Sequence, residues 1–185
     1  MRFICGLYNG FFSFIEKMTG DWFLGLAARL VFSSVLLAYF FNSGLTKIGS
    51  GFPGIFMASD GAYAQILPSI AESVGYDTSQ IAFIPYGLIV HLGTYAEFVF
   101  PVLILVGLLT RFAALAMIGF ISVMTYVDIA FHGLGAKAIG MPFDRIHDSV
   151  VWDQRLLWIF PLVYLVVRGA GQFSIDGLLS RICKN

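Results

Sequence analysis

The stretch Pro85–Leu109 reads PYGLIVHLGTYAEFVFPVLILVGLL, and it decides the fold of this chain. Its 25 residues include one histidine, His91, and one carboxylate, Glu97, and no lysine or arginine. A helix that crosses the hydrocarbon core of a bilayer needs about 20 mostly apolar residues, so this stretch is long enough to span a membrane. The sequence therefore predicts a transmembrane helix here, with two ionisable side chains inside the bilayer.

The composition of the whole chain agrees with a membrane protein. Of its 185 residues, 58% are hydrophobic and 12% are charged, about half the charged share (~25%) of a soluble domain. The mean hydropathy of +0.85 excludes disorder, which needs low hydrophobicity and high charge. Eleven basic and eleven acidic residues cancel and form no basic patch, so we expect no nucleic-acid partner.

Three further apolar stretches extend this pattern, at residues 22–42, 112–131 and 149–168. They carry Arg29, Asp128 and Arg155 respectively, and the last stretch reaches spanning length only if Arg155 enters the membrane. The sequence thus predicts an all-α fold, an integral membrane four-helix bundle that forms a single domain over residues 1–185. Its spans are expected at about 22–42, 85–109, 112–131 and 149–168, with a tight turn at 110–111.

Two shorter helices are expected outside the spans. Within residues 1–20, apolar side chains recur at helical spacing, and no A-x-A cleavage site follows them. An N-terminal interfacial amphipathic helix is therefore favoured over a signal peptide. After the last span, Gly169 and Gly171 end the helix, and Ser174 or Asp176 caps a short C-terminal surface helix at Gly177–Cys183.

Basic residues in the loops predict the orientation, because cytoplasmic loops carry an excess of Lys and Arg. With the N-terminus inside, the cytoplasmic side holds six of them: Arg2, Lys17, Arg111, Arg168, Arg181 and Lys184. The outer side then holds three: Lys47, Lys137 and Arg145. We therefore expect both termini in the cytoplasm, and loops 43–84 and 132–148 outside.

Ionisable side chains within the spans cost at least ~2.5–3.5 kcal/mol each on insertion scales, so each needs a partner or a function. At about 1.5 Å of rise per residue, Glu97 falls at the midplane and Arg29 about 10 Å from the inner side. Arg155 and His91 fall about 9 Å below the outer side. Asp128 is the nearest carboxylate in depth to Arg155, which predicts an Arg155–Asp128 contact with His91 at the same level.

Two interpretations of these side chains stay open. In the first they are structural ion pairs, in which Glu97 pairs with Arg29 or Arg155 and fixes which helices are neighbours. In the second they surround a polar pocket for a quinone or another small ligand, against whose ring Trp158 and Tyr95 would stack. The candidate ligand-binding residues are Arg29, His91, Glu97, Asp128, Arg155 and Trp158. No haem, flavin, nucleotide or iron–sulfur motif is detectable in the sequence, so quinone is considered as a bound substrate.

A metal site is the weaker chemical interpretation. His91, His132 and His147 all belong to the outer side, and imidazole suits borderline divalent metals. Their spacing is irregular, so we expect no metal ion.

Four motifs occur along the chain in a fairly specific order. They are Arg29, Gly44-Leu45-Thr46-Lys47, Glu97 followed by Gly107-Leu108-Leu109-Thr110-Arg111, and Gly169-Ala170-Gly171-Gln172-Phe173-Ser174-Ile175-Asp176. Together they resemble the DoxX family of small four-helix bacterial membrane proteins. The family usually has Arg or Lys where this sequence has Gln172, and its outer loops are shorter.

The resemblance implies a protein of the bacterial cytoplasmic membrane. Some DoxX-like proteins are linked to quinone-coupled sulfur oxidation or to membrane oxidoreductase complexes. The resemblance therefore implies a small subunit or partner of a quinone-linked membrane redox system, associated with the lipid bilayer and with other membrane or periplasmic subunits. Whether the chain is itself an enzyme stays open.

Two alternatives remain beside this function, and each predicts a different structure. A non-enzymatic scaffold for a periplasmic or membrane partner predicts saturated ion pairs and no cavity. A carrier for a small solute or a metal predicts a polar path from Arg155 through Glu97 to Arg29. A quinone site predicts a ligand-sized cavity beside Glu97 or His91 that reaches the lipid.

Overall fold

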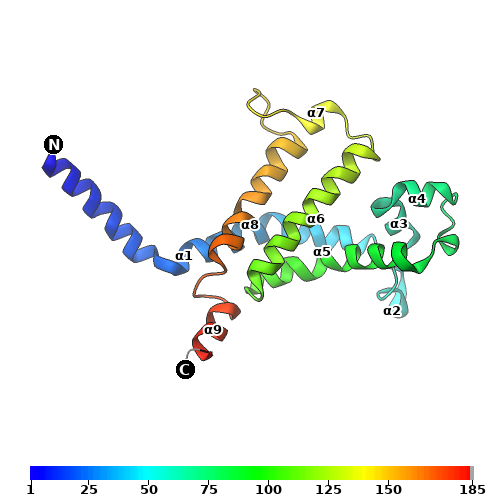
Figure 1. The fold of residues 1–185 in the computed structure, drawn as a ribbon, viewed down its shortest axis with the longest axis horizontal. Helices are drawn as coiled ribbons and strands as arrows, with labels where there is room; N and C mark the ends of the chain where they lie inside the picture. Colours follow the sequence, from blue (N-terminus) through cyan, green and yellow to red (C-terminus); the bar gives the residue numbers. More distant parts are fainter. Residues whose placement is uncertain (184–185) are drawn as a thin grey trace.

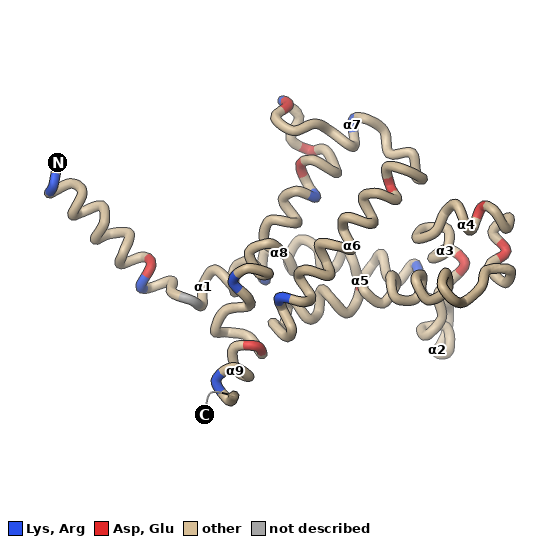
Figure 2. The backbone as a smooth tube through the Cα atoms, in the orientation of Figure 1, with Lys and Arg blue, Asp and Glu red and all other residues tan. Residues whose placement is uncertain are grey.

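The computed structural model describes residues 1–183, and every element of regular secondary structure within them is a helix (Figure 1). Lys184, one of the basic residues used above for the orientation, lies outside the described residues. The charged residues gather in the loops and toward the helix ends, and the middle of the long helices is almost free of them (Figure 2). This distribution is the one that a bilayer requires.

Within residues 1–183, four helices are long and apolar enough to cross a membrane. They are Trp22–Leu45 within α1 (Arg2–Leu45), Phe83–Val106 with α5 (Leu88–Val106), α6 (Thr110–Ala130), and Val150–Arg168 with α8 (Leu156–Arg168). Every end lies within three residues of the predicted span. The turn between the second and third spans is earlier than expected, because Gly107 takes a φ of 73° and ends α5.

The four spans form a ring in which α1 and α6 each pack against both α5 and α8. The α1/α5 pair and the α6/α8 pair meet near the α5–α6 turn and diverge from it (Figure 1). We call the end with residues 107–109 and 169–175 the terminal end, and the end with loops 46–82 and 131–149 the loop end.

All four spans contribute to one apolar core, in which side chains are at most 1% exposed. Its buried residues are Phe32, Leu36, Phe40, Ile104, Ala113, Ala114, Met117, Ile121, Leu162 and Leu165. The outer faces are apolar as well: Leu157 and Phe160, for example, are 70% and 74% exposed. An apolar outer face is what a helix in contact with lipid needs, since the solvent there is hydrocarbon.

The predicted N-terminal helix is present as the first part of α1, which bends at Gly20 (φ 40°). It projects away from the bundle (Figure 1), and its apolar side chains, such as Phe3 and Phe11, are exposed. The C-terminal helix α9 (Ile175–Ile182) is also present. Ser174 is its cap, because its Oγ accepts a hydrogen bond from the Gly177 N–H at 2.9 Å.

Short helices order the two loops at the loop end. The first loop contains α2 (Gly51–Gly54), α3 (Asp60–Ile66), α4 (Pro68–Ser73) and the one-turn helix Thr78–Gln80, and the second contains α7 (Ala136–Ile139). A small apolar cluster holds the first loop on α5 through Ala62, Tyr63, Ala71 and Val90. Asp77 also lies in the first loop, and its carboxylate accepts hydrogen bonds from Gln80 and Ser79. These bonds lower the pKa of Asp77, and the bond from Gln80 has the larger effect.

Candidate functional site

Arg29 lies at the terminal end, where it is 5% exposed and donates only to backbone carbonyls. Its Nε and Nη2 donate to the oxygens of Ile104 at 3.0 Å and Leu105 at 2.6 Å, in the last turn of α5. Its Nη1 donates to Ala170 at 3.3 Å and Phe173 at 2.7 Å, after α8. The last carbonyl groups of a helix lack partners within it. The guanidinium supplies hydrogen bonds to two such groups of α5 and joins this helix to the chain after α8. The expected pairing with Glu97 is wrong.

Asp176 completes this arrangement from the closing motif. Its carboxylate accepts hydrogen bonds from the N–H groups of Leu109 at 2.8 Å and Thr110 at 2.9 Å, at the start of α6. Its own N–H donates to the Gly107 oxygen at 2.8 Å. A carboxylate suits a helix N-terminus because the first N–H groups of the helix are unpaired there.

Gly107 lies where these partners converge. A Cβ at this position would lie 2.5 Å from Ser174 Cβ and 2.9 Å from Arg29 Cζ, so only glycine fits. We call Arg29, Gly107, Ser174 and Asp176, with the α5–α6 turn that they bind, the terminal clasp. The terminal clasp gives a structural role to Arg29, to the motif that begins at Gly107 and to the closing motif at residues 169–176. Gln172 of the closing motif is exposed beside the clasp.

At the loop end, Glu97 pairs with Lys47, whose Nζ lies 3.0 Å from Oε1 and 3.2 Å from Oε2. The two side chains are 4% and 6% exposed. Lys47 also donates to Ser43, to its Oγ at 2.6 Å and its carbonyl oxygen at 3.2 Å. Sequence reasoning assigned Lys47 to an outer loop and missed this pair. The available signal was that Lys47 is the sole basic residue of loop 43–84.

This pair corrects one expectation about Glu97. It contacts neither Arg29 nor Arg155, because helix α1 ends beside it and Lys47, two residues beyond Leu45, presents a nearer cation. Along the second span, Phe83–Val106, Glu97 lies close to the middle.

The second ion pair joins α8 to α6. Arg155 Nη2 contacts Asp128 Oδ2, which confirms the predicted pairing, and Arg155 Nη1 donates to Thr125 Oγ1 at 2.8 Å. The other carboxylate oxygen of Asp128 lies 3.0 Å from His132 Nδ1. Arg155 is 4% exposed, so this cation too is removed from solvent.

His91 does not join this pair. Its Nδ1 donates to the Gly87 oxygen at 2.7 Å, and its Nε2 accepts from the Ala58 N–H at 3.2 Å. A ring that donates at one nitrogen and accepts at the other is neutral. His91 therefore ties the first loop to α5 instead of facing Arg155.

A cavity of about 820 Å³ lies between α5 and α6 at the loop end. Its walls are mostly apolar side chains of these two helices, including Leu92, Val99, Phe100, Gly119, Phe120 and Val123. Its polar groups are Tyr39, Ser43, Lys47, Gln65, Tyr95, Glu97, Asp128 and His132. Leu92 and Val123 are each 62% exposed on the outside of the bundle, so the cavity opens sideways, toward the membrane.

The structure thus separates the six predicted ligand-binding residues. Glu97 and Asp128 line the cavity, and Arg155 contacts Asp128. Trp158 packs against the cavity residue Tyr39, with ring centroids 5.5 Å apart. The last two candidates have other roles, Arg29 in the terminal clasp and His91 beneath the first loop. Sequence reasoning missed the cavity residues Tyr39 and Ser43, which carry no sequence signal of their own.

The three histidines named for a metal do not come together. Within residues 1–183, no three side chains among His, Cys, Asp and Glu are placed to hold an ion. His132 has Asp128 beside it, and His91 is engaged with backbone groups.

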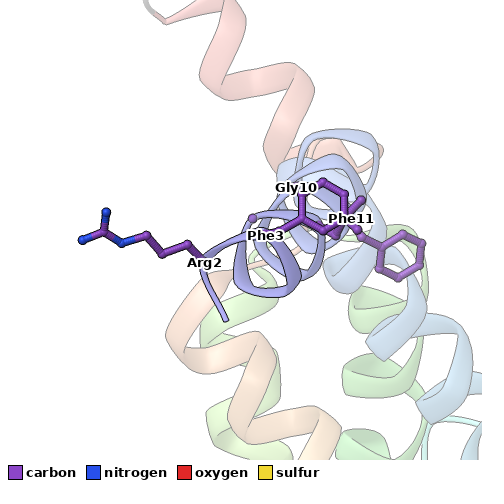
Figure 3. A pocket seen from close by; sticks show the side chains of 6 residues that line it. Arg2, Phe3, Gly10 and Phe11 are labelled. Carbon is purple, nitrogen blue, oxygen red and sulfur yellow. The ribbon is translucent and has the colours of Figure 1, made fainter.

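A second hollow, of about 780 Å³, lies on the first part of α1. All its lining residues come from this single helix, where Gly6 and Gly10 leave space between Phe3 and Phe11, and Arg2 points away (Figure 3). No second element forms an opposite wall. It is an exposed helix surface, not an enclosed site.

Comparison with known proteins agrees with this architecture. The family model described as DoxX matches residues 24–133, more than half of the chain. A Haemophilus influenzae protein described as uncharacterized is 30% identical over 99 residues, which are 54% of this chain and 58% of that protein. The chain therefore spans a little over half the length of this relative. No solved structure matches the chain.

Proposed function

The chain belongs to the DoxX family, and from this premise we propose that it binds a quinone in the cavity at the loop end. In this proposal it is a multi-pass protein of the bacterial inner membrane with both termini in the cytoplasm. It acts as a small subunit or partner of a membrane redox system, whose electron carrier belongs to another subunit. The observation that carries the proposal is the cavity beside Glu97.

The size and the lining of the cavity suit this ligand. Pockets for small molecules commonly measure about 300–1,000 Å³ and combine apolar walls with a few polar groups. A quinone has an apolar tail and ring, which Phe100, Phe120 and Val123 can contact, and carbonyl oxygens that accept hydrogen bonds. The polar groups lie on opposite sides of the cavity, with Lys47–Glu97 on one and Asp128–His132 on the other.

The opening of the cavity favours a ligand that dissolves in lipid. Its rim includes residues that are exposed on the outer faces of α5 and α6, such as Ile89 and Gly119. A quinone could enter between these helices from the bilayer without passing through water. A polar solute would have to cross apolar surface to reach the same groups.

The arrangement of the charges argues against the two alternatives. A carrier needs a continuous polar path, but the fully packed core, with Phe32, Leu36 and Phe40, separates Arg29 from the loop end. A scaffold was expected to have saturated ion pairs and no cavity. The ion pairs are present, and the cavity lies beside them.

The proposal is tested by filling the cavity. A Cβ at Gly119 would meet no atom within 4 Å, so Gly119→Leu places a side chain in the cavity without disturbing the helix. Ser122→Leu is the matched control, because Ser122 is exposed on the same helix and does not line the cavity. Each protein is purified in nanodiscs, and binding of decyl-ubiquinone is measured by calorimetry.

Wild type and Ser122→Leu should bind the quinone, and Gly119→Leu should bind at least ~10-fold more weakly, a difference of about 1.4 kcal/mol. Wild-type binding no stronger than that of empty nanodiscs would refute the proposal. If Gly119→Leu binds the quinone as tightly as the wild type, the quinone does not bind in this cavity.

A further inference from the structure

Tyr39 brings a hydroxyl group into the cavity that has no partner within residues 1–183. The ring of Tyr39 is held by Phe40 and Trp158, with centroids 5.1 and 5.5 Å away. The residue is 44% exposed and lines the cavity. Tyr95 lines the same cavity, but its hydroxyl donates to the Ile55 oxygen at 3.0 Å. The two tyrosines therefore differ in whether their O–H group is already used.

The charged groups near Tyr39 are engaged with one another. Glu97, Asp128 and Arg155 all lie close enough to act on the Tyr39 hydroxyl electrostatically. Glu97 is bound by Lys47, and Asp128 is bound by Arg155 and His132. Within residues 1–183, the Tyr39 hydroxyl joins neither ion pair.

An O–H group in apolar surroundings without an acceptor costs free energy, and buried tyrosine hydroxyls usually find a partner. The cavity walls are mostly hydrocarbon and the cavity opens toward lipid, and the carboxylates nearby are already engaged in ion pairs. A ligand that enters with an oxygen acceptor would satisfy the group. A plain hydrocarbon chain would not.

We propose that the Tyr39 hydroxyl donates a hydrogen bond to a ring carbonyl oxygen of the bound ligand, and so selects quinone head groups over hydrocarbon of the same shape. This inference rests on the proposed function, because it assigns a residue within the same cavity. Tyr39 acts as a binding and selectivity residue, and its ring stays fixed by Trp158.

The test compares two ligands on one substitution. Tyr39→Phe removes the hydroxyl and keeps the ring, and Tyr126→Phe is the control, since Tyr126 is 63% exposed on α6 and does not line the cavity. The ligands are decyl-ubiquinone and a decyl-substituted methylbenzene that lacks the ring oxygens. Dissociation constants are measured in nanodiscs, and the carbonyl stretch of bound, ¹³C-labelled quinone is recorded by infrared spectroscopy.

Tyr39→Phe should weaken quinone binding roughly 3- to 10-fold, the range for one hydrogen bond, and leave the oxygen-free ligand unchanged. The carbonyl stretch should move to higher frequency in Tyr39→Phe and stay in place in Tyr126→Phe. Unchanged quinone binding by Tyr39→Phe would overturn the assignment of Tyr39 and leave the proposed function standing. Equal weakening of both ligands would indicate a packing role and also overturn it. Absence of quinone binding by the wild type would instead refute the proposed function.

Discussion

Lys47 and Glu97 bring opposite charges together where neither side chain is more than 6% exposed. Removing charges from water is costly, and a buried pair recovers that cost only when both partners are present. Arg29 achieves the same end differently, with four carbonyl acceptors and no carboxylate. At the residue scale, these charged side chains are thus held in two ways, Lys47 and Glu97 by ion pairing at the loop end and Arg29 by backbone oxygens at the terminal end.

We predict that removing one member of the Lys47–Glu97 pair costs more than removing both. Lys47→Met should lower the free energy of unfolding by about 3–5 kcal/mol, because it leaves a buried carboxylate without its cation. The double variant Lys47→Met/Glu97→Gln should recover much of that loss. The measurement is a double-mutant cycle by denaturant titration in mixed micelles, and additive losses would contradict a coupled pair.

We predict that Gly107→Ala disrupts the terminal clasp. The residue has a φ of 73°, and a methyl group there would lie 2.5 Å from Ser174 Cβ, so the loss should exceed the ~1 kcal/mol of a strained backbone alone. Gly119→Ala is the matched control. Its methyl group meets nothing within 4 Å inside a helix, so this variant should gain about 0.5–1 kcal/mol. Equal midpoints of thermal unfolding for the two variants would refute the clasp.

At the scale of elements, the first loop behaves as part of the cavity wall. Gln65 and Ile66 of α3 line the cavity, and three hydrogen bonds hold the loop in place. The N–H groups of Ser59 and Ala58 donate to the Lys47 oxygen and to His91 Nε2, and the Tyr95 hydroxyl donates to Ile55. The loop is therefore attached to α5, and it is held against its own first residues next to the Lys47–Glu97 pair.

We predict that His91→Phe loosens this loop without unfolding the bundle. The substitution removes the acceptor of the Ala58 N–H, so amide hydrogen exchange over residues 46–60 should be roughly 2- to 10-fold faster, the effect of one lost hydrogen bond. His147→Phe, at an exposed position of the second loop, should leave that exchange unchanged. The rate of amide hydrogen exchange is measured by mass spectrometry. A uniform increase in this rate over all helices would instead show that the whole bundle is destabilised.

At the scale of the whole molecule, the two helix pairs are joined firmly at one end and part at the other. The terminal clasp binds α1, the α5–α6 turn and the chain after α8 into one unit. Among the described residues of the loop end, Lys47–Glu97 joins the segment after α1 to α5, and Arg155–Asp128 joins α8 to α6, so neither pair crosses from one helix pair to the other. The space between the pairs is consequently the cavity.

We predict that the terminal end faces the cytoplasm. The two native cysteines are exposed: Cys183 directly follows α9, and Cys5 lies in the first part of α1, which projects away from the bundle (Figure 1). A membrane-impermeant maleimide should therefore label neither in spheroplasts and both after permeabilisation. A cysteine introduced by Ser50→Cys, in the first loop, should be labelled in intact spheroplasts. Labelling of the native cysteines before permeabilisation would reverse the orientation.

The sequence alone was enough to predict the four spans to within three residues at every end. Hydropathy and helical rise are local properties, so they can be read along the chain without knowing how the helices meet. The same arithmetic made Asp128 the carboxylate nearest in depth to Arg155, and the predicted contact between them is present. The sequence also predicted the short helix α9 and named Ser174 or Asp176 as its cap, and the structure selects Ser174 and starts the helix at Ile175.

Only the tertiary structure decided what the other polar residues contact. Depth along a helix does not state which way a side chain faces, and the rotation and crossing of α1 and α5 turn Lys47 toward Glu97 and Arg29 toward carbonyl oxygens. Backbone acceptors carry no residue-specific signal, so no reading of the sequence could have found the partners of Arg29. The cavity and the free hydroxyl of Tyr39 exist because two helix pairs diverge, and that divergence is a property of packing between segments far apart in the chain.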